Sequence, residues 1–260
     1  ALANADKDGK TMGDELARIG YAGETTVGAE KIEAFFETHI EQGPILEAEG
    51  SSIGVVLGAQ AQRNFLFTVD GTEGHAGTSP MDRRRDALLV AARMIDAINK
   101  AAFRQTPWPV VTVGSLTVRP NSPNTIPGQV RFTIDSRHPE AATLTRLHED
   151  IGETCRAIAQ EAGLGLTIEK TDERKAVAFD DLCAQNIRDA AEALGHSYRD
   201  IYSGAGHDAC NLAEVAPTGM IFVPCEDGIS HNPAENATAE DLGAGGDVLL
   251  HAMLSRAGRV

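Results

Sequence analysis

The residues that could carry chemistry begin in one stretch, Glu37-Thr38-His39-Ile40-Glu41-Gln42-Gly43-Pro44. It places an imidazole that can bind a metal ion, two carboxylates and an amide within a few residues. Apolar and polar side chains alternate through it, the period of a strand with one buried and one polar face. Gly43-Pro44 ends the strand and predicts a short helix that finishes near Gly50. Such a polar face often holds the chemistry of an α/β protein, although the pattern also fits an exposed edge strand.

The eight histidines divide into two groups of four. The first group lies in glycine-bracketed turns at the ends of apparent strands and consists of His39, His75, His207 and His231. The second lies in helices or charged loops, which indicates surface or packing roles, and consists of His138, His148, His196 and His251. A single turn histidine most often has a structural role, but four of them predict a shared pocket.

Two further polar residues suit an anionic substrate. Arg137 at a strand end offers a planar fork for a carboxylate, and Asn124 in a proline-held loop both donates and accepts hydrogen bonds. A surface salt bridge and a turn residue are the plainer interpretations of the two. Gly204 and Gly206 either ease a tight turn or let the backbone approach a ligand closely.

The pattern of elements predicts three segments, 1–61, 62–172 and 173–260. In the middle segment, strands and helices follow in the order strand–helix–strand–strand–helix–strand, which is the split β-α-β sandwich. Its expected elements are strands around 65–69, 109–118, 129–135 and 164–171, and helices around 87–102 and 140–162, the first introduced by Ser79-Pro80 after a loop at 74–77. We therefore predict an α+β domain inserted into an incomplete α/β domain.

The flanking segments carry their own elements. They are expected to form a helix at 11–19 capped by Thr11, a strand at 53–57, a helix at 180–194, a strand at 218–224 and a helix at 239–255. Alternating and helical apolar periods support each of them.

Composition bounds the class of protein. A length of 260 residues with 42% hydrophobic and 23% charged residues is typical of a globular protein with a sizeable core. The formal net charge of −15 argues against nucleic acid as a partner. Four scattered cysteines favour reduced, mostly buried thiols, and no apolar run has the length of a membrane helix, so we expect a cytoplasmic protein.

Six ordered motifs together carry a family resemblance. They are THIEQGPILE, GHAGTSPM followed by RRDAL, NTIP, IDSRHP, SGAGHDA and GISHNPAE. From about Asp8 onward the chain resembles the dimetal amidohydrolases that include N-carbamoyl-L-amino-acid hydrolase, β-ureidopropionase and allantoate amidohydrolase. These belong to the wider aminoacylase and carboxypeptidase-like metallopeptidase superfamily, in which two metal ions, commonly zinc or manganese, activate a water that attacks an amide or ureido carbon.

The resemblance implies a role for each matching residue. His39 and His231 become ligands, one for each metal ion. The implied substrate-binding residues are Gln42, His75, Asn124, Arg137 and Gly206. Carboxylates close to the motifs either support the ligands or are solvated surface, and these are Glu37, Glu41, Asp208 and Glu235. The family also implies that the inserted domain is both a lid and a dimerisation domain, so we expect a homodimer and a small substrate with a carboxylate.

The chain departs from the family in one respect. The family's histidine-x-aspartate motif, bridging aspartate and Glu-Glu pair, which supply further ligands and the general base, have no counterpart before His39. We therefore expect the C-terminal portion of such an enzyme, without catalytic residues of its own and holding metal poorly. The alternatives are an aminoacylase or peptidase of the same superfamily, and a truncated non-catalytic dimerisation protein.

Overall fold

The computed structural model of the chain describes residues 2–25, 28 and 31–259. It forms two compact units, Ala1–Glu33 and Ala34–Val260. The first contains α1, Met12–Arg18, and the predicted cap is confirmed because the Thr11 side chain accepts a hydrogen bond from the Asp14 N–H. The unit boundary lies at residue 33, so the predicted boundaries after residues 61 and 172 remain predictions.

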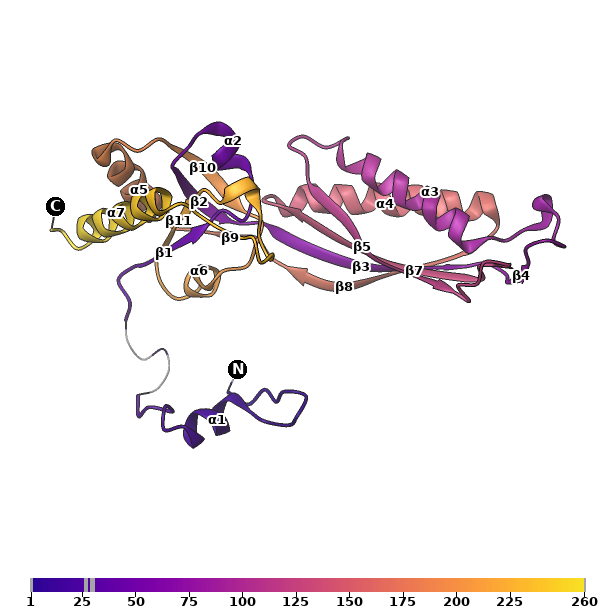
Figure 1. The fold of residues 1–260 in the computed structure, drawn as a ribbon, viewed down its shortest axis with the longest axis horizontal. Helices are drawn as coiled ribbons and strands as arrows, with labels where there is room; N and C mark the ends of the chain where they lie inside the picture. The colour runs from indigo at the N-terminus through magenta and orange to yellow at the C-terminus, as the bar shows by residue number, and fades with distance from the viewer. Residues whose placement is uncertain (1, 26–27, 29–30, 260) are drawn as a thin grey trace. The chain divides into compact units, whose positions relative to one another are not determined.

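The second unit contains a mixed sheet with helices on both faces (Figure 1). Its strand order is β1-β11-β2-β10, with β9 paired to β2. The strands are β1 Phe35–Ile40, β2 Ile53–Ala59, β9 Val177–Ala178, β10 Tyr198–Ser203 and β11 Thr218–Val223. One apolar core joins the sheet to α5, Asp181–Leu194, and α7, Ala239–Arg256. A second core on the opposite face contains Leu46 of α2, Ile45–Glu49, and Ala209 of α6, Asp208–Leu212.

Strand β1 alternates as predicted, but both of its faces are covered. Phe36 and Ile40 pack against the core of α5 and α7, whereas Phe35 packs against the other core. All residues of β1 are half-buried, which corrects the expectation of one buried and one polar face. Within the described chain β1 pairs with β11 alone, so it is an edge strand whose side chains are nevertheless half covered.

The middle of the sequence forms a second, antiparallel sheet in the order β5-β7-β3-β8. Its elements confirm the predicted order and are β3 Ala61–Asp70, α3 Ala87–Ala102, β5 Val110–Arg119, β7 Gln129–His138, α4 Ala141–Ala162 and β8 Gly165–Arg174. Both helices cover one face of the sheet, where Phe67 and Phe132 stack with ring centroids 5.0 Å apart. The opposite face carries mostly polar side chains.

Two local expectations are wrong and one strand was missed. The cap of α3 is Asp86, which accepts hydrogen bonds from the N–H groups of Leu88 and Leu89, whereas Ser79-Pro80 precedes a separate 3-10 turn, Met81–Arg83. The predicted loop at 74–77 begins with a short strand, β4 Gly74–His75, paired with β6 Thr125–Ile126. Strand β10 was not predicted, because charged residues interrupt its apolar positions.

The chain passes between the two sheets twice, at Gln60 and again at Lys175-Ala176 between β8 and β9. Gln60 separates the end of β2 from the start of β3, and its backbone N–H donates to the Ser203 carbonyl oxygen at 2.9 Å. The first residues of β3 and the last residues of β7 therefore lie beside the mixed sheet, since Gln62 pairs with Arg137. At this end of the second sheet, the side chains of Gln62 and Arg137 line a cavity that residues of the mixed sheet also line.

Three of the four thiols are buried in the protein interior. All four cysteines are free, and Cys155, Cys183 and Cys225 are buried. Burial raises the pKa of Cys155 and of Cys183 to about 12, so neither thiol ionises near neutrality. In the part of the chain that the structure describes, no helix is long and apolar enough to span a bilayer.

We expect Gly228→Ala to destabilise the protein more than Gly50→Ala. Gly228 has a φ of +64°, and a Cβ there would lie 2.7 Å from the Pro44 nitrogen. Gly50 has a similar φ of +66° but no atom within 4 Å of its Cβ position. Urea unfolding should show a loss of about 1–2 kcal/mol for the left-handed backbone alone at Gly50, and a further loss of that order at Gly228. Equal losses would contradict the close backbone contact.

Candidate functional site

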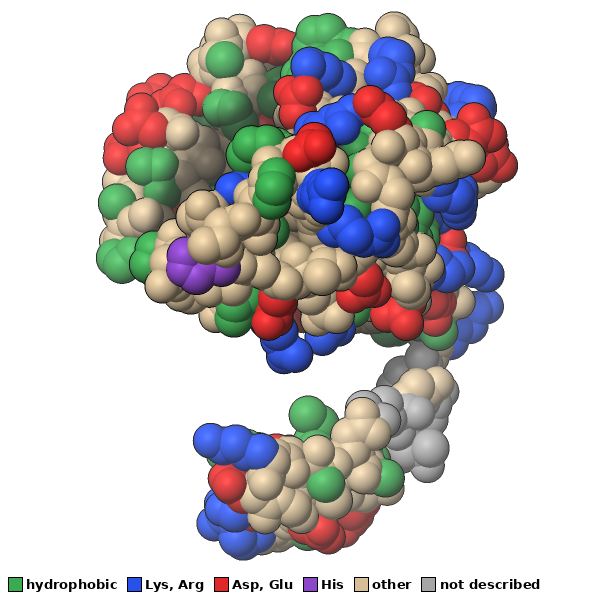
Figure 2. Space-filling view, turned by 90° about the vertical axis from the view of Figure 1, so that its right-hand side faces the viewer, with side chains coloured by type: hydrophobic (Ala, Val, Ile, Leu, Met, Phe, Trp, Pro, Cys, Tyr) green, Lys and Arg blue, Asp and Glu red, His purple; other side chains and the backbone are tan. Residues whose placement is uncertain are grey.

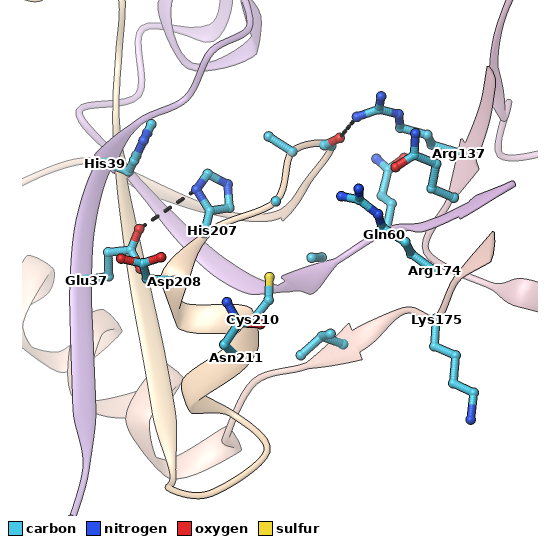
Figure 3. A pocket seen from close by; sticks show the side chains of 16 residues that line it. Glu37, His39, Gln60, Arg137, Arg174, Lys175, His207, Asp208, Cys210 and Asn211 are labelled. Carbon is cyan, nitrogen blue, oxygen red and sulfur yellow. Dashed lines mark hydrogen bonds and ion pairs between the residues drawn. The ribbon is translucent and has the colours of Figure 1, made fainter. Parts of the chain in front are cut away.

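A cleft of about 710 Å³ opens where β1, the glycine-rich turn before α6 and the end of the second sheet meet (Figure 3). Glu37 and His39 project into it from β1, and His207 and Asp208 from the start of α6. Arginine side chains from the second sheet line the other end. The cleft therefore has a histidine and carboxylate end and a basic end.

His39 has the tautomer of a metal ligand. Its Nδ1 lies 2.8 Å from the Ile40 carbonyl oxygen, which can only accept, so Nδ1 carries the proton of the neutral ring. The Nε2 lone pair is then free, and such an outer hydrogen bond commonly orients a ligating histidine. The geometry of His39 fits the role that the resemblance implies.

His207 lies in the same cleft as His39, as the predicted shared pocket requires, although the resemblance assigned no individual role to it. Its ring centroid lies 4.8 Å from that of His39, its Nε2 lies 2.6 Å from Ser203 Oγ, and its Nδ1 lies 3.8 Å from Glu37 Oε1. Burial and, to a smaller extent, the neighbouring His39 lower the pKa of His207 to about 4, so the ring is neutral at pH 7. The glycine-bracketed turn was the sequence signal for this residue.

Glu37 organises the turn around His207. Its Oε2 accepts the Ala209 N–H at 2.7 Å, which fixes the start of α6, while Oε1 faces the His207 ring. Ser203, which is buried, accepts the Ala205 N–H at 3.0 Å. Glu37 therefore orients residues of the site and is not merely solvated surface, which was the other interpretation of the sequence. Asp208 is exposed on the cleft wall.

A second cavity of about 680 Å³ adjoins the first and contains Gln42 and His231. Gln42 Nε2 donates to Ser230 Oγ at 2.9 Å, and Ser230 donates to Glu235 Oε2 at 2.8 Å. The His231 N–H donates to the same carboxylate oxygen at 3.0 Å. Two motifs far apart in sequence are thus connected through a chain of hydrogen bonds.

The backbone at both of these residues is strained. Gln42 has a φ of 59° and His231 a φ of 55°, in the left-handed region that residues with a side chain rarely adopt. Each such residue costs on the order of 1–3 kcal/mol and persists where its surroundings hold it in place.

The pKa of Glu235 is lowered chiefly by the Ser230 hydrogen bond, then by the His231 N–H, with smaller contributions from the His231 and His39 rings. Both predicted metal ligands therefore act on one carboxylate.

Arg137 lies in the wall that the two cavities share, together with Gln60, Gly204 and Ala205. Its Nε and Nη2 form a fork with Asp135 at 2.8 and 2.9 Å, and its Nη1 donates to the Gly204 carbonyl oxygen. The fork raises the pKa of Arg137 and lowers that of Asp135. Three of its five N–H groups are thus used, which leaves two for a ligand.

Gly204 and Gly206 of the glycine-rich turn do not adopt backbone conformations that require glycine. Neither Gly204 nor Gly206 has a φ in the left-handed region, so the tight-turn interpretation is wrong for both. A Cβ on Gly206 would meet only Arg174 Nη1, at 3.8 Å, an ordinary contact. Close approach of a ligand to the backbone remains the prediction for Gly206.

His75 and Asn124 lie together, but away from both cavities. His75 follows the far end of β3, and Asn124 directly precedes β6, which pairs with β4 there; the ten residues of β3 span about 30 Å at the usual strand rise. The Gly77 N–H donates to His75 Nδ1 at 3.0 Å, so neutral His75 carries its proton on Nε2. Asn124 Oδ1 accepts hydrogen bonds from Ser122 and Thr125, which leaves its NH₂ group free to donate. Figure 2, viewed from this end, shows a histidine side chain at the surface.

Glu41 lines the second cavity, but its carboxylate is bonded to the start of α2. It is buried, and its two oxygens accept the Ile45 and Leu46 N–H groups at 2.9 and 2.7 Å. The carboxylate thereby satisfies donors at the start of α2 and interacts favourably with the helix dipole. Neither solvated surface nor support of a metal ligand describes it.

The described residues hold no group of three or more His, Cys, Asp or Glu side chains placed to bind one metal ion. A catalytic zinc site usually has three protein ligands and one water. The roles of His39 and His231 as metal ligands stay predictions.

The chain matches peptidase family M20/M25/M40 over residues 10–255. It is 46% identical to the N-carbamoyl-L-amino-acid amidohydrolase of Rhizobium meliloti over 99% of this chain and 62% of that protein. It is 37% identical to the allantoate amidohydrolase of Escherichia coli K12 over 92% of this chain and 59% of that protein.

Solved structures agree with these relatives. The amidase of the hydantoinase/carbamoylase family from Burkholderia multivorans superposes with a TM-score of 0.94 at 54% identity, over 98% of this chain and 62% of that one. The chain thus spans about three fifths of the length of these relatives. The match over nearly the whole chain shows that it belongs to peptidase family M20/M25/M40.

Proposed function

We propose that this chain is part of a metal-dependent amidohydrolase that cleaves a linear C–N bond of N-carbamoyl-L-amino acids or a related ureido compound. One observation carries the proposal: Arg137 lies in the wall shared by two cavities, one containing His39 and the other His231. A carboxylate bound at Arg137 would place the adjacent carbamoyl group between the two histidines. The names of the amidohydrolase relatives support the ureido substrate class.

His39 and His231 would each hold one of two divalent ions, zinc or manganese, with the remaining ligands and the general base supplied by residues outside this chain. Two bound ions would polarise the ureido carbonyl and lower the pKa of a water molecule. His39 offers Nε2 because its Nδ1 proton is committed to Ile40, and Glu235 holds the backbone of His231. Gln42 and Gly206 would contact the substrate from the cavity walls.

The protein would act as a homodimer through its second sheet. Strands β5 and β8 are the edges of that sheet, and pairing an edge across a two-fold axis would satisfy its free backbone groups. The donors of His75 and Asn124 lie too far along the sheet to reach the cleft of their own chain. Their proposed substrate contacts would therefore be made in the cleft of the second copy.

We expect Arg137→Lys in the full-length protein to lower kcat/KM by ~1.5–3 kcal/mol, because an ammonium group cannot replace the guanidinium fork. The measurement compares an N-carbamoyl-L-amino acid with the matching compound that lacks the carboxylate. The loss should be much smaller for the second compound. Equal losses would assign Arg137 a purely structural role through Asp135 and Gly204.

The 260-residue chain by itself should hold metal poorly and show no turnover. After dialysis against zinc, manganese or cobalt, metal analysis should give well below one tightly bound ion per chain, since a closed site needs about four ligands. Ureido hydrolysis with added metal should be absent. Two tightly held ions, or turnover abolished by His231→Ala, would refute the idea that further ligands are required.

Mixing two inactive variants of the full-length protein tests the shared cleft. His75→Ala and Arg137→Ala should each be inactive, because each removes one contact from both sites of the dimer. After exchange of subunits, the mixture should regain on the order of a quarter of wild-type activity, since about half of the dimers are then heterodimers and each of these holds one intact site of two. A mixture that stays inactive, or a monomer by light scattering, would contradict the proposal.

A further inference from the structure

A row of three polar residues crosses the second sheet beside the cleft. Gln62 of β3 is the register partner of Arg137 on one side and of Arg174 on the other. Register partners on adjacent strands point to the same face of a sheet. Strands lie roughly 4.8 Å apart, so the Cα atoms of the two arginines are separated by about 10 Å. Arg174, which no sequence motif indicated, thus occupies the same row as Arg137.

Arg174 extends over the glycine-rich turn as Arg137 does. Arg137 bonds to the carbonyl oxygen of Gly204, and Arg174 Nη1 lies 3.8 Å from the position of a Cβ on Gly206. Both guanidinium groups line the first cavity (Figure 3). Arg174 also helps to lower the pKa of Asp135, which places its charge close to the Arg137 fork.

The two arginines differ in how strongly a neighbouring carboxylate already binds their guanidinium groups. Arg137 is held by a two-bond fork to Asp135. The ion pair of Arg174 is a single exposed contact, with its Nε 3.5 Å from Asp172 Oδ2 and a side chain that is 68% exposed. A contact of that kind adds little stability and exchanges readily for another anion. The guanidinium of Arg174 is therefore available to a ligand in the cleft.

The charge at this end of the cleft exceeds what its own carboxylates balance. Three cations gather there, Arg137, Arg174 and Lys175, against the carboxylates of Asp135 and Asp172. The acidic residues Glu37 and Asp208 lie at the opposite end, beside the histidines. The whole chain carries a formal charge of −15, so this local excess of positive charge favours anionic ligands in the cleft specifically.

We infer that Arg174 is a specificity-determining residue that binds a second carboxylate, so that the site selects ureido substrates with an acidic side chain. The inference rests on the proposed function. The α-carboxylate would bind at Arg137, and the side-chain carboxylate would displace Asp172 from Arg174. A guanidinium group can contact a carboxylate through two parallel hydrogen bonds, which a neutral amide of the same shape cannot match.

The experiment compares N-carbamoyl-L-glutamate with N-carbamoyl-L-glutamine, which differ by one charge at nearly constant shape. In the full-length protein the wild type should favour the acidic compound, and Arg174→Gln should lower its kcat/KM about tenfold or more, mainly through KM. The amide compound should change by less than about threefold, and the preference should weaken as salt concentration rises. Arg93→Gln is the matched control, because Arg93 forms an exposed ion pair with Glu161 on the helical layer.

Calorimetric binding of the same two compounds separates this inference from the proposed function. If the wild type cleaves neither compound, the proposed function fails, while tighter binding of the acidic compound that Arg174→Gln abolishes still supports the role of Arg174. If the wild type binds both compounds equally or binds neither, the inference fails. It also fails if Arg174→Gln weakens both compounds equally, or if Arg93→Gln reproduces its effect.

Discussion

The contact between Arg137 and the glycine-rich turn is the interaction on which the site depends. One guanidinium, anchored by Asp135 on its own strand, donates to the Gly204 carbonyl oxygen of a turn from the other sheet. Gln62 fixes the same carboxylate with a hydrogen bond of 2.6 Å. The chain also joins the two sheets at Gln60 and at Lys175-Ala176, and the Arg137 contact adds a direct bond between the walls of the two cavities.

In the loops around the second cavity, hydrogen bonds stabilise strained backbone conformations. Gln42 and His231 both adopt left-handed backbone conformations, and Ser230 and Glu235 link them. The close backbone packing of Gly228 against Gly43 and Pro44 brings these loops together. Strained residues held by surrounding structure are typical of functional sites, because strain persists only where a rigid environment opposes it.

Burial and charge divide the cleft into two chemically different ends. At one end burial lowers the pKa of His207 and keeps its ring neutral, while the Nδ1 hydrogen bond of His39 orients that ring with its Nε2 free. At the other end, guanidinium groups from two strands provide the positive charge. The proposed substrate, with a neutral ureido group and a carboxylate, would complement the two ends.

The elements that periodicity defines were predictable from sequence. Local apolar spacing predicts the helix over Ala141–Ala162 and the strands β3 and β7. Side-chain hydrogen bonding predicts the cap at Thr11. Strand β10 and the cap at Asp86 were not predicted. In β10, partners elsewhere in the sheet outweigh a weak local pattern, and at Asp86 two possible caps lay close together in the sequence.

For the site, the sequence by itself determined the family, the two candidate ligands and the arginine that suits a carboxylate. Only the tertiary structure decided which of these residues meet, since that depends on strand register and loop packing between segments far apart in the chain. It joined Gln42 to His231, placed His207 beside His39, diverted Glu41 to α2 and left His75 and Asn124 at the far end of their sheet. Register also brought Arg174 into line with Arg137, because cross-strand neighbours have no fixed separation in sequence.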